Sequence, residues 1–330
     1  MRPINHPSMK KTIAVVAGGT SSEYVISMRS AQTVLDCLDT EQFQPYLVVI
    51  ETGRWYARVD GAEFPIDKND FSFQQDGRKV TFEAVYNIIH GTPGEDGKMQ
   101  GYWDLIELPY TGCDVLTSAI TFSKSVCKEL VRTHGITTPQ SVMVRQGEDY
   151  SAEALAASLS FPCFVKPNNG GSSFGVSKVD EPNQLAAAIE KALEHDREAL
   201  VEEYIKGQEL TCGVYQQDGQ AQALPITAII SKNAFFDFQA KYEGASEEVT
   251  PAPISEPLTE QCQRLTEKIY TLLHGRGFMR IDYMLRDETL YFIEANTTPG
   301  FSPQSIFPEQ VRVAGIDLKA LVNRQLQEIM

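Results

Sequence analysis

The sequence predicts an α/β unit followed by α+β structure, divided among three domains. A chain of 330 residues exceeds the size at which one hydrophobic core usually keeps growing. Buried strands alternate with a helical pattern in the first third of the chain, and paired strands dominate the last third. We therefore expect an N-terminal, a central and a C-terminal domain at residues 1–112, 113–203 and 204–330.

The N-terminal domain begins with an apolar strand at residues 11–17, which stops at Gly18. A helical pattern covers residues 27–38, and further buried strands are expected at 46–50 and 85–89. Strand–helix–strand alternation favours parallel pairing with helices on the faces of the sheet. The pattern thus predicts a Rossmann-like parallel sheet, with ligands gathering at the carboxyl ends of its strands.

The other two domains are predicted from shorter periodic segments. The central domain is expected to contain helices at 118–133 and 186–193 and strands at 141–144, 164–166 and 200–205. The C-terminal domain is expected to contain strands at 210–215, 223–230, 279–285 and 290–294, with helices at its end. Residues 231–253 are polar and weakly periodic, and loops of that length are often lids over active sites.

The composition narrows the class of protein and its partners. Apolar residues make up 42% of the chain, yet no apolar run is long enough to cross a bilayer. Residues 1–11 lack the apolar stretch of a signal peptide, and we expect a disordered extension there, with Met9 as an alternative start. The net charge of −15 disfavours nucleic acid and anionic membranes as partners, so a bound polyanion must meet locally concentrated basic residues.

The six cysteines are scattered along the sequence and contain no C-x-x-C pair. In a chain of this length, that spacing indicates reduced core thiols in the cytoplasm, rather than disulfides or a zinc site. A catalytic cysteine is possible in principle, but no neighbouring residue supports that interpretation.

The most informative pattern consists of charged residues that alternate along two expected neighbouring strands. Arg280 and Asp282 are two residues apart, as are Glu294 and Asn296, so each pair shares one face of its strand. Two carboxylates and an amide form an all-oxygen site that suits Mg²⁺ and leaves room for phosphate oxygens. Arg280 would neutralise charge during phosphoryl transfer. A solvated hairpin explains each residue singly, but not the whole pattern with its Pro299-Gly300 stop.

A second pattern, KPNNGGSSFG at residues 166–175, joins a lysine at a strand end to glycines and serines. Glycines let backbone N–H groups approach an anion closely, serines add hydroxyl donors, and Lys166 adds a point charge. The segment predicts a phosphate-binding loop, although it matches neither a Walker A loop nor a dinucleotide fingerprint. A glycine-rich hairpin without a ligand is the alternative that this segment alone leaves open.

Three further polar segments follow strand ends. The acidic residues of EEYIKGQE, at 202–209, would accept hydrogen bonds from adenine or ribose, or would simply face water. Glu23, in the loop GGTSSE, would repel phosphate and suits an amino-acid ammonium, unless it only complements the dipole of the next helix. His90 is either a polar site residue or a satisfied core histidine. No nucleophile elbow or local Ser-His-Asp arrangement is detectable.

Together these segments resemble the D-alanine–D-alanine ligases. The match covers nearly the whole chain from Lys10 onward, with the motifs in the family's order and approximate spacing. The motifs are GGTSSE at 18–23, HGTPGEDGKMQG at 90–101, KPNNGGSSFG at 166–175, EAN and TTPG at 294–300, and Lys241-Tyr242 in the lid. The resemblance implies an ATP-grasp fold and ATP-dependent formation of D-alanyl-D-alanine through an acylphosphate. It also implies a cytoplasmic homodimer that serves peptidoglycan synthesis.

The resemblance further implies roles for individual residues. Glu23 would bind the ammonium of the first D-alanine and would join Ser172 and Tyr242 in a hydrogen-bonded link that closes the lid. Arg280 and the Gly300 amide would stabilise an oxyanion. The second substrate's carboxylate would bind Ser305 and the Ile306 amide, and His90 would lie near both substrates.

The resemblance places ATP between the central and C-terminal domains, with two Mg²⁺ ions for which Mn²⁺ would substitute. The metal ligands would be Asp282, Glu294 and Asn296. The phosphates would contact Lys124, Lys166, Ser173 and Lys241. Adenine and ribose would be framed by Glu202, Glu203, Tyr204, Ile205 and Glu209.

The chain departs from the family pattern at three positions. Val25 stands where many members carry an acidic residue, which puts the fine positioning of the first substrate in doubt. Met279 replaces a small residue and Tyr283 an aliphatic one, and both are expected to change packing only. A related carboxylate–amine ligase, including a D-alanine–D-lactate ligase, is the nearest alternative. A nicotinamide oxidoreductase and an inactive nucleotide-binding regulator are alternatives from other classes.

Overall fold

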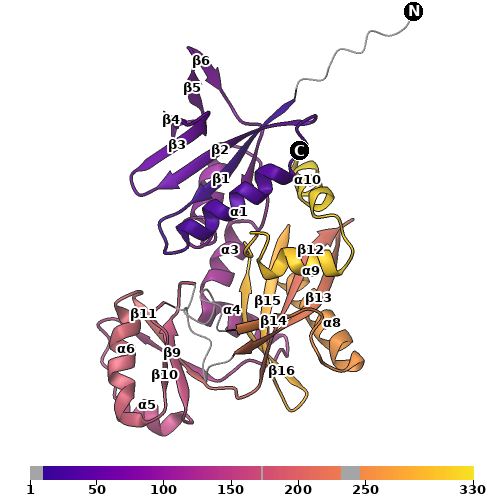
Figure 1. The fold of residues 1–330 in the computed structure, drawn as a ribbon. Coiled ribbons are helices and arrows are strands. Elements are labelled where there is room, and N and C mark those ends of the chain that lie inside the picture. The colour runs from indigo at the N-terminus through magenta and orange to yellow at the C-terminus, as the bar shows by residue number, and fades with distance from the viewer. Residues whose placement is uncertain (1–9, 172–173, 232–245) are drawn as a thin grey trace, which may run out of the picture.

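The structure, a computed structural model, describes residues 10–171, 174–231 and 246–330, which form three sheet-based units (Figure 1). The first unit lies at one end of the molecule, and the second and third lie together at the other end (Figure 1). The predicted site residues Ser172, Ser173, Lys241 and Tyr242 lie outside the described residues.

The first sheet has the order β4-β3-β2-β1-β7, and its central strands are parallel as predicted. β1 (Lys11–Gly18) pairs in parallel with β2 (Phe43–Glu51) and with β7 (Ala84–Asn87). Parallel strands end at the same edge of a sheet, so the loops that follow β1 and β7 leave the sheet together. Those loops contain Glu23 and His90, which are therefore brought to one place.

Strand β1 is buried on both faces, which explains its continuous apolar sequence. Val15 packs in one cluster with helix α1 (Tyr24–Cys37). Val16 packs on the opposite face with Trp103 of helix α2 (Lys98–Leu105). The doubly covered parallel strand is the part of the α/β prediction that the structure confirms most directly.

The three predicted strands are parallel, and two further antiparallel strands at one edge make the first sheet mixed. β3 (Arg54–Val59) and β4 (Ala62–Pro65) extend it by antiparallel pairing beyond β2. Asp60 and Gly61 join them with φ of 50° and 82°, the left-handed pair that a tight hairpin requires. The Asp-Gly dipeptide is typical of such a hairpin turn and can be recognised in the sequence. A short hairpin of β5 (Phe73–Gln75) and β6 (Arg78–Val80) follows.

The second sheet is antiparallel, has the order β10-β9-β11-β8, and is covered by helix α6 (Leu185–Leu193). Its strands are β8 (Ser141–Arg145), β9 (Cys163–Pro167), β10 (Ser177–Val179) and β11 (Glu198–Glu203). Helix α5 (Ala152–Ser158) and the 3₁₀ turn η1 (Pro182–Gln184) complete this unit. The predicted strands and the predicted helix are all present, whereas β10 and α5 were not predicted.

The third sheet is also antiparallel and has the order β14-β13-β12-β15-β16. Its strands are β12 (Gln208–Gln217), β13 (Gln220–Ser231), β14 (Ser246–Val249), β15 (Phe278–Arg286) and β16 (Thr289–Asn296). Helix α8 (Glu256–Leu272) and helix α9 (Ile306–Val313) pack against β13. The end of the predicted lid is therefore not irregular, because β14 pairs with β13.

The helix predicted at 118–133 is two helices, α3 (Val115–Phe122) and α4 (Lys124–Thr133). They are separated by Ser123, whose backbone is extended with φ of −86° and ψ of 102°. Cys127 and Val131 of α4 share a core with Phe292 of the third sheet. These helices therefore pack on the third sheet, although they precede the second sheet along the chain.

All six cysteines are unpaired thiols, and five of them are buried, as the reduced-core interpretation predicts. Within the described ranges, the helices are too short or too polar to cross a membrane.

The C-terminal helix α10 (Leu318–Ile329) returns to the first unit and packs against α1. Asn323 accepts a hydrogen bond from the backbone N–H of Asp39 at 2.8 Å and donates to the carbonyl of Cys37 at 2.9 Å. The hydroxyl of Tyr86 donates to Gln325 at 2.8 Å. Helix α10 thus provides hydrogen-bond partners for backbone groups at the end of α1, and these bonds hold the third unit against the first.

We expect Asn323→Ala to lower the free energy of unfolding by about 1–3 kcal/mol, because two partly buried backbone groups lose their partner. The exposed Gln327→Ala in the same helix is the control, with an expected change below about 0.5 kcal/mol. Urea unfolding followed by tryptophan fluorescence measures both. Equal unfolding midpoints for the two variants would contradict this role of Asn323.

Candidate active site

Two cavities meet at the hairpin formed by β15 and β16. The larger cavity, of about 680 Å³, is lined by residues of the second and third sheets. The smaller cavity, of about 400 Å³, is lined by the loops of the first unit and by the segment after β16. Residues that line both are Lys124, Gly170, Gly171, Glu248, Arg280, Glu294 and Ile306. A group bound in one cavity can therefore react with a group bound in the other.

The hairpin presents its polar side chains to the cavities because alternate residues of a strand face opposite sides. Arg280 pairs with Asn296 and Asp282 pairs with Glu294 across the two strands, as the sequence predicts. On the opposite face, Ile281 is completely buried. Met279 and Tyr283, two of the family departures, are buried in the same core, so they alter packing there.

Three side chains donate hydrogen bonds to the carboxylate of Asp282. Nε and Nη2 of Arg280 donate to its two oxygens at 2.9 Å each. The side chain of Asn296 donates to Oδ2 at 2.9 Å, and the hydroxyl of Thr211 donates to Oδ1 at 2.5 Å. These bonds fix the orientation of a carboxylate that is only 8% exposed. Thr211 was not predicted, because it lies on β12, far away in the sequence.

The donor set at this hairpin fits a hard cation that shares its coordination with a substrate. Asp282 and Glu294 supply carboxylate oxygens and Asn296 an amide oxygen, the ligand types that Mg²⁺ prefers. In the described part of the chain, no cluster of three His, Cys, Asp or Glu residues forms a metal cage. Mg²⁺ commonly completes such a partial set with water and phosphate oxygens.

Two predicted lysines approach the hairpin from different elements. Nζ of Lys124, at the start of α4, lies 2.9 Å from Oε2 of Glu294 and donates to the carbonyl of Gly170 at 2.7 Å. Burial opposes the charge on Lys124, but Glu294 raises its pKa above the usual value. Burial, followed by the charge of Lys124, lowers the pKa of Lys166 to about 8. Both ammonium groups line the larger cavity.

Glu202 lies among lysines rather than at the open edge of the cavity. It is 3% exposed, and its Oε1 accepts from Nζ of Lys166 at 2.6 Å. Its Oε2 forms an ion pair with Lys128 of α4, which sequence reasoning did not identify. The i, i+4 spacing of Lys124 and Lys128 on one helix face is the signal that was overlooked.

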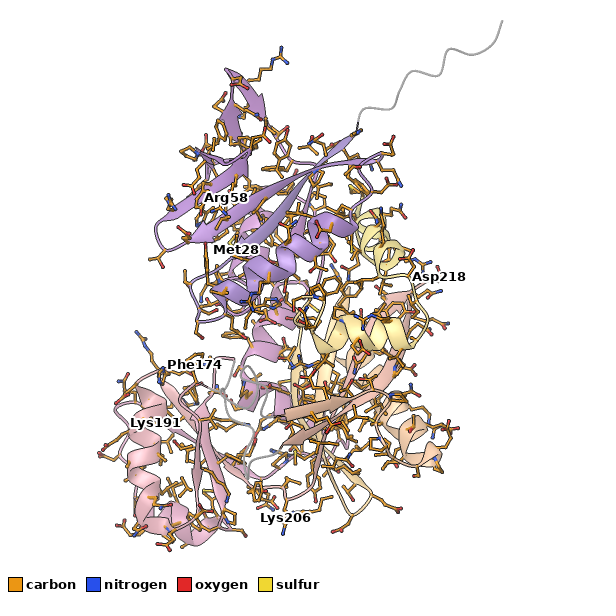
Figure 2. All side chains as sticks on the ribbon, in the orientation of Figure 1. Met28, Arg58, Phe174, Lys191, Lys206 and Asp218 are labelled. Atoms are coloured by element: carbon orange, nitrogen blue, oxygen red, sulfur yellow. The ribbon has the colours of Figure 1, made fainter. Side chains whose placement is uncertain are left out.

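The remaining described residues that were predicted to bind the nucleotide line the larger cavity. They are Glu203, Tyr204, Ile205 and Glu209. Glu203 accepts a hydrogen bond from Arg286 at 3.3 Å. Apolar side chains of Phe164, Ile229, Met284 and Ile293 form another part of the wall. Phe174, which also lines this cavity, lies at the tip of the second unit nearest to the first unit (Figure 2). The cavity therefore combines an apolar surface for a flat ring with ammonium groups for an anion.

Glu23 lies where the loop of the first unit meets the glycine-rich loop. A Cβ atom on Gly171 would lie 2.7 Å from Oε2 of Glu23, and one on Gly91 would lie 3.0 Å from the same oxygen. Gly91 also has a φ of +72°, which most side chains avoid. Both glycines are therefore required for the close approach, which places the Glu23 carboxylate in the smaller cavity.

His90 is a buried residue that connects the first unit to the segment after β16. Its Nδ1 lies 2.8 Å from the carbonyl of Thr298, which can only accept, so Nδ1 carries the proton. Nε2 then accepts from the hydroxyl of Ser30 at 2.8 Å, and the Ser30 oxygen accepts from the N–H of Phe301 at 3.1 Å. Burial lowers the pKa of His90, which favours this neutral form.

Glu95 is a second connection between the same segments. Its two oxygens accept from the backbone N–H groups of Gly91 at 2.6 Å and of Thr298 at 2.9 Å. Burial, followed by the charge of Glu23, raises the pKa of Glu95 to about 8. Together with Ser30 and His90, this residue sets the position of the loop that carries Gly300. Glu95 stands within the quoted HGTPGEDGKMQG motif but was not singled out.

Ser305 and Ile306 form the start of α9, at the edge of the smaller cavity. The hydroxyl groups of Ser305 and Ser302 are 2.9 Å apart. Backbone N–H groups at a helix start, together with the helix dipole, favour a negatively charged group. The predicted Gly300 lines the same cavity.

The structure thus brings the described residues of the predicted site into two adjoining cavities. It adds Ser30, Glu95, Lys128 and Thr211, whose roles depend on contacts between distant parts of the chain. Val25, the third family departure, is 58% exposed and does not line either cavity.

Comparisons with known proteins agree with the motifs and with the geometry. The family model described as "D-ala D-ala ligase N-terminus" matches residues 12–113, and "D-ala D-ala ligase C-terminus" matches residues 130–327. The D-alanine–D-alanine ligase of Bacteroides fragilis is 45% identical over 313 residues, which cover 94% of this chain and 97% of that one. The ligase of Phocaeicola vulgatus is 46% identical with the same coverage.

Solved structures of the same kind superpose on almost the whole chain. The VanG D-Ala:D-Ser ligase from Enterococcus faecalis gives a TM-score of 0.87 at 31% identity, covering 97% of this chain and 100% of that one. D-alanyl-alanine synthetase A from Vibrio cholerae gives 0.87 at 29% identity, covering 97% and 98%. The two family models and these identities show that the chain belongs to the D-alanine–D-alanine ligase family.

Proposed function

We propose that this protein joins two molecules of D-alanine into D-alanyl-D-alanine, coupled to the conversion of ATP into ADP and phosphate, for peptidoglycan synthesis. The observation that carries the proposal is the meeting of two chemically different cavities at Arg280 and Glu294. The larger cavity has lysines beside apolar walls and suits a nucleotide. The smaller one has the carboxylate of Glu23 and the start of α9, and suits an amino-acid zwitterion.

The chemistry requires activation of the first carboxylate, because a carboxylate is a poor electrophile. One carboxylate oxygen of the first D-alanine attacks the γ-phosphorus of ATP, and ADP leaves with the electrons of the broken bond. The amine of the second D-alanine then attacks the acylphosphate carbonyl and loses a proton. Collapse of the tetrahedral intermediate breaks the bond to phosphate and forms the peptide bond.

Each described residue has a role that fits its position. Glu23 binds the first ammonium, with His90 close to the substrates. Ser305 and the Ile306 amide receive the second carboxylate, while Arg280 and the Gly300 amide stabilise the oxyanion. Lys124 and Lys166 bind phosphates, and adenine and ribose contact Glu202, Glu203, Tyr204, Ile205 and Glu209. Ser172, Tyr242, Ser173 and Lys241, for lid closure and phosphate binding, stay predictions from the sequence.

Asp282, Glu294 and Asn296 would hold two Mg²⁺ ions, or Mn²⁺ in their place, and the ions would neutralise phosphate charge. We further propose the division into domains at 1–112, 113–203 and 204–330, with 231–253 as the lid. A homodimer in the cytoplasm completes the proposal. The unpaired thiols agree with that location.

Phosphate release from ATP and Mg²⁺ tests the proposed reaction. We expect release that depends on D-alanine, not on L-alanine, with D-alanyl-D-alanine as the product detected by mass spectrometry. D-serine and D-lactate, each added with D-alanine, test the acceptor, because a D-Ala:D-Ser ligase is among the similar structures. A preferred product other than the D-alanine dipeptide would overturn the proposed acceptor and leave the fold assignment intact.

We expect Glu294→Gln to lower kcat by roughly 100-fold or more and to raise the Mg²⁺ concentration that gives half-maximal rate. The reason is that the variant loses one anionic metal ligand. Glu288→Gln, an exposed change in the turn of the same hairpin, is the matched control. A Mg²⁺ titration of the rate distinguishes them, and an unaltered requirement in Glu294→Gln would exclude this residue as a ligand.

We expect Ser305→Ala to raise the KM of the second D-alanine by roughly 10-fold, because the substrate carboxylate loses a charge-assisted hydrogen bond. The KM of the first D-alanine should stay near its wild-type value. Ser302→Ala removes the neighbouring hydroxyl and serves as the control for the Ser302–Ser305 contact. The same KM increase in both variants would assign the effect to loop structure rather than to substrate binding.

A further inference from the structure

Lys128 is a buried cation with no part in the proposed reaction. Its side chain is 0% exposed, and it lies one turn after Lys124 on α4. Burial of an ammonium group costs free energy unless a counter-ion lies beside it. Burial, followed by the charge of Lys166, lowers the pKa of Lys128, and the charge of Glu294 opposes that shift. The carboxylate of Glu202 lies in direct contact with the Lys128 ammonium group.

The carboxylate of Glu202 is shared between two ammonium groups. Lys166 contacts Oε1 at 2.6 Å, and Lys128 contacts Oε2. Lys166 and Glu202 line the larger cavity, but Lys128 does not. Glu202 is therefore neutralised from the protein side by Lys128, while Lys166 lies on the cavity side.

The cluster of Lys128, Lys166 and Glu202 has an excess of positive charge, which a bound anion would balance. With Lys128 and Lys166 both protonated, two ammonium groups and one carboxylate carry one net positive charge, whereas Lys124 and Glu294 balance each other. Without Lys128, Glu202 would form a one-to-one pair with Lys166, and the pair would carry no net charge. When Lys128 pairs with Glu202, the positive charge of Lys166 is therefore available to bind a phosphate.

We propose that Lys128 is a positioning residue for the nucleotide, which neutralises and orients Glu202 so that the charge of Lys166 is available to a phosphate group. The proposal rests on the proposed function, since it assumes that the larger cavity binds ATP. It extends that function by a residue that touches no substrate. The same ion pair joins α4, which packs on the third sheet, to β11 of the second sheet. The two sheets that line the cavity are thus held together at this point.

The test compares Lys128→Met with wild type in the complete enzyme. We expect the KM of ATP to rise roughly tenfold or more, because the phosphate loses a charged partner. The KM of D-alanine should change less than about twofold, within the variability of single contacts. Adenosine, which has no phosphate but contacts Glu202, should lose less affinity than ATP does. Lys191→Met, on the outer side of α6 (Figure 2), is the control and should bind ATP as wild type does.

A double variant separates the electrostatic role from a structural one. In the Glu202→Gln background, Lys166 keeps its charge whether or not Lys128 is present, so adding Lys128→Met should leave the KM of ATP unchanged. This double variant removes both charges of the buried Lys128–Glu202 pair, which keeps the comparison possible if Lys128→Met alone does not fold.

The possible results are distinct. Equal losses of ATP and adenosine binding in Lys128→Met, or an undiminished effect in the Glu202→Gln background, would overturn the proposal in favour of a structural ion pair. Wild-type ATP kinetics in Lys128→Met would overturn it as well. A wild-type enzyme whose D-alanine ligation does not depend on ATP would instead refute the proposed function.

Discussion

The site depends on the alternation of side chains along the β15–β16 hairpin. One face of each strand packs into the core of the third unit, so the other face can carry only groups that tolerate water, ions or substrate. Arg280 and Asp282 therefore point the same way, opposite Asn296 and Glu294. The charged cluster has a fixed geometry because the apolar residues between its members, such as Ile281, cannot leave the core.

The first unit contributes to this centre by holding a loop rather than by supplying a nucleophile. Neutral His90, Ser30 and Glu95 all bind the backbone of Thr298 or Phe301. These bonds are buried or partly buried, where an unmade hydrogen bond is costly, so they restrict the loop containing Gly300. The amide proposed to stabilise an oxyanion is positioned by a unit that lies more than two hundred residues earlier in the chain.

Electrostatics in this protein are local rather than global. The chain carries a net charge of −15, yet two lysines line one cavity and a third lies buried behind it. Each lysine lies beside a carboxylate, so the folded protein can bury them before an anion arrives. The protein is therefore stable without a ligand and still attracts a polyanion to this cavity. An overall positive charge would also attract polyanions, but with less selectivity for one site.

The sequence by itself determined the parallel core of the first sheet, the paired strands of the hairpin and the glycine-rich loop, because each depends on local periodicity or composition. Only the tertiary structure decided the partners of Glu202 and His90, since those contacts join segments that are distant in the chain. It also revealed an irregular register after Asp282, where Tyr283 pairs with Phe292 and Ile293 is passed over. This shift turns Phe292 into the core, whereas simple alternation would have placed it beside Glu294. Long-range packing selects such a bulge, and no local sequence pattern specifies it.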